Sequence, residues 1–436
     1  MKVLGSILVI IITSLFYFPF TTSLLPTVNT KMLLAAVGLI LLAYHVAQRH
    51  DAMANSAFMS VSAWALLVSL IGLFSAFVND SGDYTYASYI VSAWVWMAGA
   101  YVVIKCINIV YGRSTLRLLA NILIAVCVGQ CIISQIIDIS TSFAEWVDSF
   151  MVSTGFMGKA EGRLYGIGCA LDVAGLKFCA VLILLAYFAI NPSKKINVYI
   201  ETSFYIAAFF IISIFGSMIS RTTSIGVLMA IAYWIWISIN NRGFSILVNQ
   251  NRYFWIVMSM ALVLLVPAII YWYQMDDDFY EKLRFGFEGF FSLVENGEWN
   301  VSSNNRLMGM WVWPDNYKTW LIGDGYFNTP DLNPYYIGPS FKGYYMGTDI
   351  GYCRFIFYFG LIGLVIFSAY FINCAKICSK IIPRCRILFW LILLVNFVGW
   401  FKVSSDLFPI YALILVLGKE SVKESDSQFF ENTDKF

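Results

Sequence analysis

Apolar residues occur in long continuous runs along the whole chain, and short polar stretches separate them. A membrane-spanning helix needs about 20 mostly apolar residues, and a chain of such helices satisfies its backbone hydrogen bonds within each segment. The pattern predicts an all-α polytopic membrane protein with about twelve transmembrane helices. The expected spans are 3–20, 32–47, 57–78, 86–110, 116–137, 169–190, 198–219, 222–239, 253–273, 352–374, 387–401 and 406–418.

Both ends of this pattern need interpretation. The run Val3–Phe20 follows one lysine, as in a signal peptide, but no small-x-small cleavage site follows it, which favours a retained first span. The last two apolar runs are short, so they are either two tilted spans or one broken span. We expect a single transmembrane domain over 1–418 and a polar, disordered tail over 419–436.

Two polar interruptions are longer than the others. The first, 138–168, contains TSFAEWVDSFM, whose apolar residues recur at helical spacing and predict a helix lying at the membrane interface. The second, 274–351, begins with a predicted amphipathic helix over Phe279–Leu293. From Asn296 onward it is rich in Gly, Pro, Asn and Asp, which predict turns rather than long elements.

Composition supports a membrane protein and gives the orientation. The chain is 60% hydrophobic and 12% charged, whereas about a quarter of the residues of a soluble domain are charged. Lys and Arg accumulate in cytoplasmic loops. With twelve spans and a cytoplasmic N-terminus every inner loop holds Lys or Arg, and the short outer loops 21–30 and 79–85 have none. Both termini are then cytoplasmic, and 138–168 and 274–351 are extracytoplasmic.

Two classes of ligand are not expected. The net charge of +2 is too small to indicate binding to nucleic acid. The nine cysteines lie mostly in apolar segments, where cysteine is a small apolar residue. Those at 374–385 have no nearby His, and the scattered acidic residues of the large loop do not form a coordination set. We therefore expect no metal and no cofactor.

Arginines near the predicted outer membrane edge are the first candidates for function, because charge in that position is costly. Arg221 lies in GSMISRTTSIG between two apolar runs, and a tight helix-to-helix corner there favours an anion. Its guanidinium matches phosphate oxygens. Arg163 in GKAEGRLYG and Arg306 in SNNRLMGMW are weaker candidates. The alternatives are lipid headgroup contacts for Arg163 and Arg221, and a surface ion pair for Arg306.

Several other charged residues need a partner or a role. Asp349 in GTDIGY is either the N-cap of the tenth span or a general base facing the outer side, and Glu161 is a second candidate base. Asp172 and Lys177 lie on different faces of the sixth span. Each therefore needs a partner from another span, and a structural ion pair is favoured for Lys177.

Aromatic residues are abundant in the large loop, and candidates for sugar contacts are Trp311, Trp313, Tyr326 and Tyr345. Such rings stack on the apolar faces of sugars, but they also lie well at the level of lipid headgroups. Both interpretations stay open.

Together these features resemble the O-antigen polymerases, within the superfamily of O-antigen ligases and polymerases. The resemblance covers mainly residues 155–375. It rests on the number of spans, the large outer loop before the tenth span, the corner Ser220-Arg221-Thr222, the arginine in NNRLMGMW, the WLIGDGYF turn and TDIGYCRFIFYFGLIG.

The resemblance implies a GT-C-like membrane glycosyltransferase in the bacterial inner membrane. Its activity would be transfer of the growing glycan from undecaprenyl pyrophosphate to the terminal sugar of an incoming lipid-linked repeat unit, in the biosynthesis of lipopolysaccharide or another polysaccharide. Undecaprenyl-pyrophosphate-linked glycans and the lipid bilayer are the implied partners, and a chain-length regulator is a further candidate.

The resemblance also implies roles for individual residues. By position, Arg221 and Arg306 match the family's pyrophosphate-binding arginines, with Arg163 as a third. Asp349 stands where many ligase-type members have His. Because the only histidines, at 45 and 50, are predicted to be cytoplasmic, a carboxylate base is favoured, and so is a polymerase over a ligase. We expect Arg221, Arg306 and Asp349 to converge on one site.

Two alternatives remain open. A flippase or other transporter of lipid-linked oligosaccharides fits twelve spans equally well, although it should line its centre with charge, and here charge gathers on the predicted outer side. The other is an O-antigen ligase. The sugars, their linkage, the type of polysaccharide and the oligomeric state do not follow from the sequence.

Overall fold

The computed structural model describes residues 2–47, 56–152, 163–193, 197–240, 252–332 and 341–417, and these residues are mostly helical. Seven of the described helices are long and apolar enough to cross a membrane. This confirms an all-α fold with membrane-spanning helices. The seven are α3 (Ser56–Val78), α4 (Tyr89–Tyr111), α5 (Leu116–Ile139), α7 (Leu171–Ile190), α8 (Val198–Ile219), α11 (Arg252–Met275) and α16 (Gly351–Ile381).

The other expected spans also coincide with helices, but these are shorter. They have 10 to 18 residues, and at 1.5 Å per residue they rise less than the roughly 30 Å of a bilayer core. The last apolar region forms two separate helices. The total of twelve spans stays a prediction. The shorter helices are α1 (Lys2–Tyr17), α2 (Thr30–Ala47), α9 (Thr223–Asn240), α17 (Arg386–Gly399) and α18 (Phe408–Leu417).

The chain divides into two compact units, each formed by two separate stretches of sequence. The first unit comprises 1–31 and 106–299, and the second comprises 32–105 and 300–436. The large loop is divided between them, since 274–299 belongs to the first unit and 300–351 to the second. The expected tail 419–436 lies outside the described residues.

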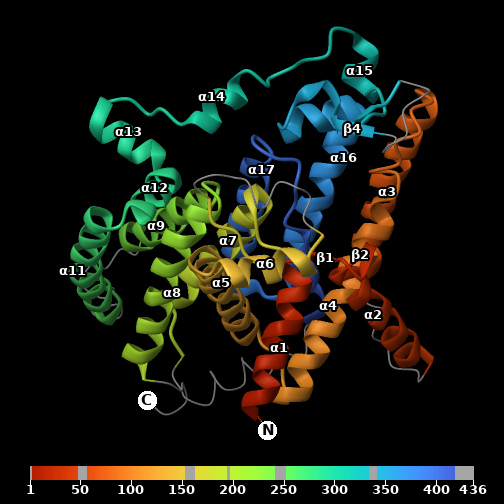
Figure 1. The fold of residues 1–436 in the computed structure, drawn as a ribbon. Helices are drawn as coiled ribbons and strands as arrows, with labels where there is room; N and C mark the ends of the chain where they lie inside the picture. The colour runs from red at the N-terminus through yellow and green to blue at the C-terminus, as the bar shows by residue number, and fades with distance from the viewer. Residues whose placement is uncertain are drawn as a thin grey trace. The chain divides into compact units, whose positions relative to one another are not determined.

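In the first unit α7 forms the centre and packs against α5, α8 and α9 (Figure 1). Almost every residue of α7 is buried, which fits its uninterrupted apolar sequence. Helix α1 also packs against α5. It leads into a short antiparallel hairpin of β1 (Thr21–Thr22) and β2 (Leu25–Asn29).

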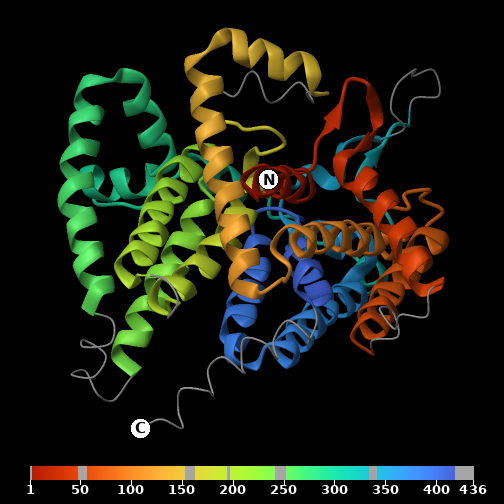
Figure 2. The ribbon, with the colours of Figure 1, turned by 90° about the horizontal axis from the view of Figure 1, so that it is seen from below.

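The helix expected in 138–168 is present as α6 (Thr141–Phe150), and it leaves the end of α5 at a sharp angle (Figure 2). Its place at a membrane interface stays a prediction. Ser140 caps its first turn by accepting a hydrogen bond from the Phe143 amide. Val147 is buried, whereas the rings of Phe143, Trp146 and Phe150 stack in a row and Trp146 is exposed. The helix is therefore amphipathic, as predicted.

The prediction of a single amphipathic helix over Phe279–Leu293 is wrong. The structure has two helices, α12 (Asp277–Gly286) and α13 (Glu288–Asn296), with a non-helical Phe287 between them. The reason is tertiary packing against α8: a Cβ added at Gly286 would lie 3.0 Å from the backbone carbon of Ser217. A glycine at this contact lets the chain approach closely and weakens the helix at the same point.

In the second unit α16 forms the centre and packs against α3, α17 and α18. It is interrupted at Gly360, whose φ of +67° is left-handed. A short helix of the large loop, α15 (Tyr317–Ile322), approaches this break so closely that a Cβ on Gly360 would lie 2.2 Å from the Leu321 backbone. The break in α16 thus provides the space for the loop.

The turn that follows α15 is fixed between α3 and α16. The Ser75 hydroxyl oxygen lies 2.7 Å and 2.6 Å from the carbonyl oxygens of Ile322 and Tyr358, which share its one proton, and the Ser81 hydroxyl donates to the carbonyl of Gly325. The buried Asp83 carboxylate accepts from the backbone amide of Phe327 at 2.9 Å. The WLIGDGYF turn is therefore anchored to α3 and α16 by hydrogen bonds.

The remaining elements after Asn296 are short, as predicted for that part of the large loop. They are α14 (Ser302–Met308), β3 (Asn328–Pro330) paired antiparallel with β4 (Phe341–Tyr344), and the 3-10 turns η1 (Tyr345–Gly347) and η2 (Pro383–Cys385).

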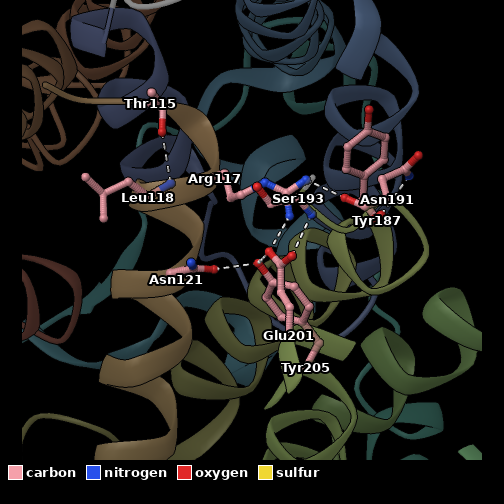
Figure 3. Close-up of polar contacts among 9 residues, drawn as sticks. All are labelled: Thr115, Arg117, Leu118, Asn121, Tyr187, Asn191, Ser193, Glu201 and Tyr205. Carbon is pink, nitrogen blue, oxygen red and sulfur yellow. Dashed lines mark hydrogen bonds and ion pairs between the residues drawn. The ribbon is translucent and has the colours of Figure 1, made fainter. Parts of the chain in front are cut away.

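A polar cluster ties α5, α8 and the end of α7 together in the first unit (Figure 3). The buried Glu201 carboxylate accepts from Arg117 Nη1 at 2.7 Å and from the Ser193 amide at 2.5 Å. The Tyr205 hydroxyl lies 2.8 Å from Asn121 Oδ1. Because the carboxylate is matched by these donors, the cluster is a structural connection on the predicted cytoplasmic side.

Candidate functional site

Arg221 occupies the tight corner that the sequence predicted, between the end of α8 at Ile219 and the start of α9 at Thr223. Its Nε donates to the Phe285 carbonyl at 2.8 Å, and its Nη1 lies 2.9 Å from a carboxylate oxygen of Glu288. Its side chain is only 14% exposed. The guanidinium therefore contacts α12 and α13 of the large loop, which does not fit the lipid headgroup alternative.

Arg163 lies over the same aromatic ring as Arg221. Their guanidinium carbons are 4.7 Å and 4.0 Å from the centre of the Phe285 ring. Burial lowers the pKa of Arg221 from its ordinary value; Glu288 opposes this shift, and the charge of Arg163 adds to it. Two guanidiniums on one ring can bind several oxygens of one anion, although the carboxylates of Glu288 and Asp172 both act on the charge of Arg221.

The Asp172 carboxylate holds this corner together through hydrogen bonds. Its Oδ1 accepts hydrogen bonds from the Thr222 hydroxyl at 2.5 Å and from the Ser220 hydroxyl at 3.2 Å. The predicted need for partners on another element is confirmed for Asp172. Lys177, deeper in α7, lies over the rings of Tyr17 and Phe18 from the α1 segment.

Arg306 and Asp349, two predicted site residues, form an ion pair in the second unit. Arg306 Nη2 lies 3.1 Å from Asp349 Oδ2, and the side chains are 68% and 34% exposed. The Asp349 side chain does not cap α16, because the N-cap residue is Ile350 and its amide instead donates to the Thr348 hydroxyl. The carboxylate is thus directed to Arg306, and both groups are accessible to a substrate.

The four predicted sugar-contact residues form two separate aromatic pairs. Tyr326 and Tyr345 stack at 5.3 Å, and the Tyr345 hydroxyl lies 3.4 Å from Asp324 Oδ2. Burial, with a further effect of Asp324, raises the pKa of Tyr345 to about 12. Trp311 and Trp313 also stack, with ring centres 5.3 Å apart, and the indole of Trp313 stacks in turn on that of Trp320.

The predicted site is only partly tested by this geometry. Arg163 and Arg221 meet in the first unit, and Arg306 and Asp349 meet in the second. The expected convergence of Arg221, Arg306 and Asp349 stays a prediction. Glu161, the second candidate base, lies outside the described residues. Among the described residues, no group of three or more His, Cys, Asp or Glu could hold a metal ion.

Sequence reasoning missed the residues that complete each contact. Phe285 and Glu288 lie on Arg221 although 64 or more positions separate them from it in the chain. Their segment, RFGFEGFF, is typical of an amphipathic helix, and nothing in it marks Phe285 among the other phenylalanines. An excess of acidic residues in the loop was the one available signal for Glu288.

Comparisons of the chain with models of known protein families, with curated proteins and with solved structures found no match.

Proposed function

We propose that this protein is a polysaccharide repeat-unit polymerase that transfers a growing glycan from undecaprenyl pyrophosphate to the terminal sugar of an incoming lipid-linked repeat unit. The product would be O-antigen, capsule or a related polysaccharide. The proposal combines the resemblance of residues 155–375 to the O-antigen polymerases with the charge distribution of the two described units.

The observation that carries the proposal is the pair of guanidiniums of Arg163 and Arg221 on the Phe285 ring. A pyrophosphate leaving group gains negative charge as the glycosidic bond breaks, and fixed cations stabilise that charge most when they are partly removed from water. Arg221 is mostly buried, and the loop helices α12 and α13 hold it in place. A flippase would need charge along its centre, and it would not need this arrangement at the end of two helices.

The proposed transfer uses the second unit as the source of the base. The acceptor hydroxyl oxygen attacks the anomeric carbon of the donor sugar, and its proton passes to the Asp349 carboxylate. The bond between that carbon and the pyrophosphate oxygen breaks, and its electron pair stays on pyrophosphate. Arg306, which holds Asp349 in the substrate-free protein, would exchange this carboxylate for a phosphate oxygen.

The test is polysaccharide length in a deletion strain complemented with variants. Arg221→Ala and Arg306→Ala should each leave chains of one repeat unit at normal protein level. Arg284→Ala is the matched control, because Arg284 belongs to the same loop and is paired with Glu295 on the surface. Long chains restored by both Arg221→Ala and Arg306→Ala would refute the mechanism. Repeat units retained on the cytoplasmic side of the deletion strain would favour a flippase instead.

A further inference from the structure

Arg354, in the first turn of α16, is held in an unusual environment inside the second unit. Its side chain lies between two aromatic rings, with the guanidinium carbon 3.5 Å from the centres of both Phe327 and Tyr344. The residue is 3% exposed. Nη1 donates to the Ser404 hydroxyl at 2.7 Å, and Nη2 donates to the Phe327 carbonyl at 3.2 Å.

The Asp349 carboxylate acts on the charge of Arg354 but does not bond to it. Within the described residues no carboxylate forms an ion pair with it, and its Nε is buried without a hydrogen-bond partner. Other shielded cations differ in this respect, since Arg117 and Arg221 have carboxylate oxygens at 2.7 Å and 2.9 Å. A buried charge without a counter-ion is costly, and attraction to two rings offsets only part of that cost.

A role in packing alone does not explain this choice of residue. Phe327 and Tyr344 flank the β3–β4 hairpin, so Arg354 connects the hairpin to α16. A neutral side chain of similar length would fill the same space between two rings without the cost of an unpaired charge. Packing therefore leaves the charge and the unused Nε of this residue unexplained.

We propose that Arg354 is the cation of an anion-binding site in the second unit, which takes the acidic group of a glycan substrate. The guanidinium edge at Nε is enclosed in the substrate-free protein and Nε has no hydrogen-bond partner there, and this edge matches an oxygen pair of a phosphate or a carboxylate. The anion is either a phosphate of the lipid carrier or the carboxylate of an acidic sugar. Only this identification of the ligand rests on the proposed function.

The place of Arg354 in the unit supports a substrate ligand. Asp349 lies directly before α16 and Arg354 lies in the first turn of that helix, so both are at the same end of it. The hairpin residue Tyr344 stacks on Arg354, and the next residue, Tyr345, stacks on Tyr326. The ring that stacks on Arg354 is therefore adjacent in sequence to a tyrosine pair that suits a sugar ring.

The experiment is titration of the purified full-length protein with sodium pyrophosphate and, separately, with sodium glucuronate by isothermal calorimetry. All variants carry Arg221→Gln, which removes the most buried guanidinium of the first unit from the measurement. Arg354→Gln should weaken binding of at least one anion by about tenfold or more, as expected for loss of a charge-assisted hydrogen-bond pair. Arg284→Gln, which changes a surface arginine paired with Glu295, should leave both affinities unchanged.

The two anions distinguish the sources of the ligand. Weaker binding of pyrophosphate alone assigns the site to the lipid carrier, and weaker binding of glucuronate alone assigns it to an acidic sugar. Arg354→Lys keeps the charge but loses the two-donor edge, so it should weaken binding less than Arg354→Gln. It also serves as the folded variant if Arg354→Gln does not accumulate.

Unchanged affinity for both anions in a folded Arg354→Gln or Arg354→Lys protein would overturn the inference and leave Arg354 as a connection between the hairpin and α16. The result is separate from that for the polymerase. Binding that depends on Arg354 in a protein without polymerase activity would keep this site and refute the proposed function.

Discussion

Replacement of Glu288 by Gln should strengthen the binding of pyrophosphate to the first unit. The Glu288 carboxylate lies 2.9 Å from Arg221 Nη1 and therefore occupies a donor that a phosphate oxygen would use. Glutamine has nearly the same shape but no charge. Its substitution leaves Arg163 and Arg221 on the Phe285 ring with less competing negative charge.

The size of the effect follows from the burial of the pair. Arg221 and Glu288 side chains are 14% and 30% exposed, so the pair is neither a surface pair nor a fully buried one. Exposed pairs contribute about 0–1 kcal/mol, and removal of one partner from a buried pair costs about 3–5 kcal/mol. An intermediate value of about 1–2 kcal/mol corresponds to roughly 5–30-fold tighter binding of the anion.

Calorimetric titration of the purified full-length protein with pyrophosphate measures this change. Glu295→Gln is the control, because it releases Arg284, which lies in the same loop but outside the Phe285 pair. Glu288→Gln should also lower the thermal midpoint of the ligand-free protein, and saturating pyrophosphate should restore it. If Glu288→Gln and Glu295→Gln bind pyrophosphate equally, or if Glu288→Gln binds it more weakly than the wild type, the anion site on Phe285 is wrong.

Three further outcomes follow from the described contacts. Glu201→Ala should lower the free energy of unfolding in detergent by about 2–4 kcal/mol, because it leaves Arg117 and the Ser193 amide without their carboxylate. As a control, replacement of the exposed Glu145 by Ala should change the free energy of unfolding by less than about 0.5 kcal/mol. Gly323→Ala should destabilise by about 2–5 kcal/mol, because its φ is +76° and its Cβ would lie 2.5 Å from the Tyr358 carbonyl; Gly297→Ala, with a φ of +72° and open space, should cost about 1–2 kcal/mol, and equal thermal midpoints would contradict the close approach. Because the pKa of Tyr345 is raised from 10.0 to about 12 in the folded protein, the unfolded chain loses this proton first, so the stability it provides is present below pH 10 and is lost between about pH 10 and pH 12. The thermal midpoint of Tyr345→Phe should therefore fall less over this interval than that of the wild type, and parallel curves would contradict the shift.

The helices could be predicted from the sequence because their signal is local and long. Each of the expected apolar runs coincides with a helix, and the ends agree within a few residues except at α16, which continues to Ile381, seven residues beyond the expected end. The amphipathic α6 was also predictable, since Val147 and the aromatic residues around it follow helical spacing. The short elements after Asn296 followed from local turn residues.

The contacts that form the candidate sites depend on long-range packing, which spacing does not encode. The break between α12 and α13 is set by the approach of Gly286 to α8, so a continuous amphipathic pattern was misleading there. Asp349 was compatible with an N-cap or a base on sequence alone. Only the position of Arg306, 43 residues earlier in the chain, shows that its carboxylate is directed away from the helix end.

The arginines of this protein differ in what surrounds the guanidinium, and that difference separates structural from functional candidates. Arg117 and Arg284 are matched by the carboxylates of Glu201 and Glu295, so their charge is already neutralised. Arg354 is shielded by two ring faces instead. Aromatic faces hold a guanidinium in place and exclude water, but they leave its net positive charge available to a substrate anion.

Arg221 combines both environments, since it lies on Phe285 and pairs with Glu288. The ring and the Phe285 carbonyl keep the guanidinium in the corner between α8 and α9 when the Glu288 carboxylate is displaced, so an incoming phosphate competes with that carboxylate for Nη1. This is why removal of Glu288 is expected to strengthen anion binding at this corner, while removal of Arg221 abolishes binding there. A purely structural ion pair would respond in the same direction, by loss of stability, to removal of either partner.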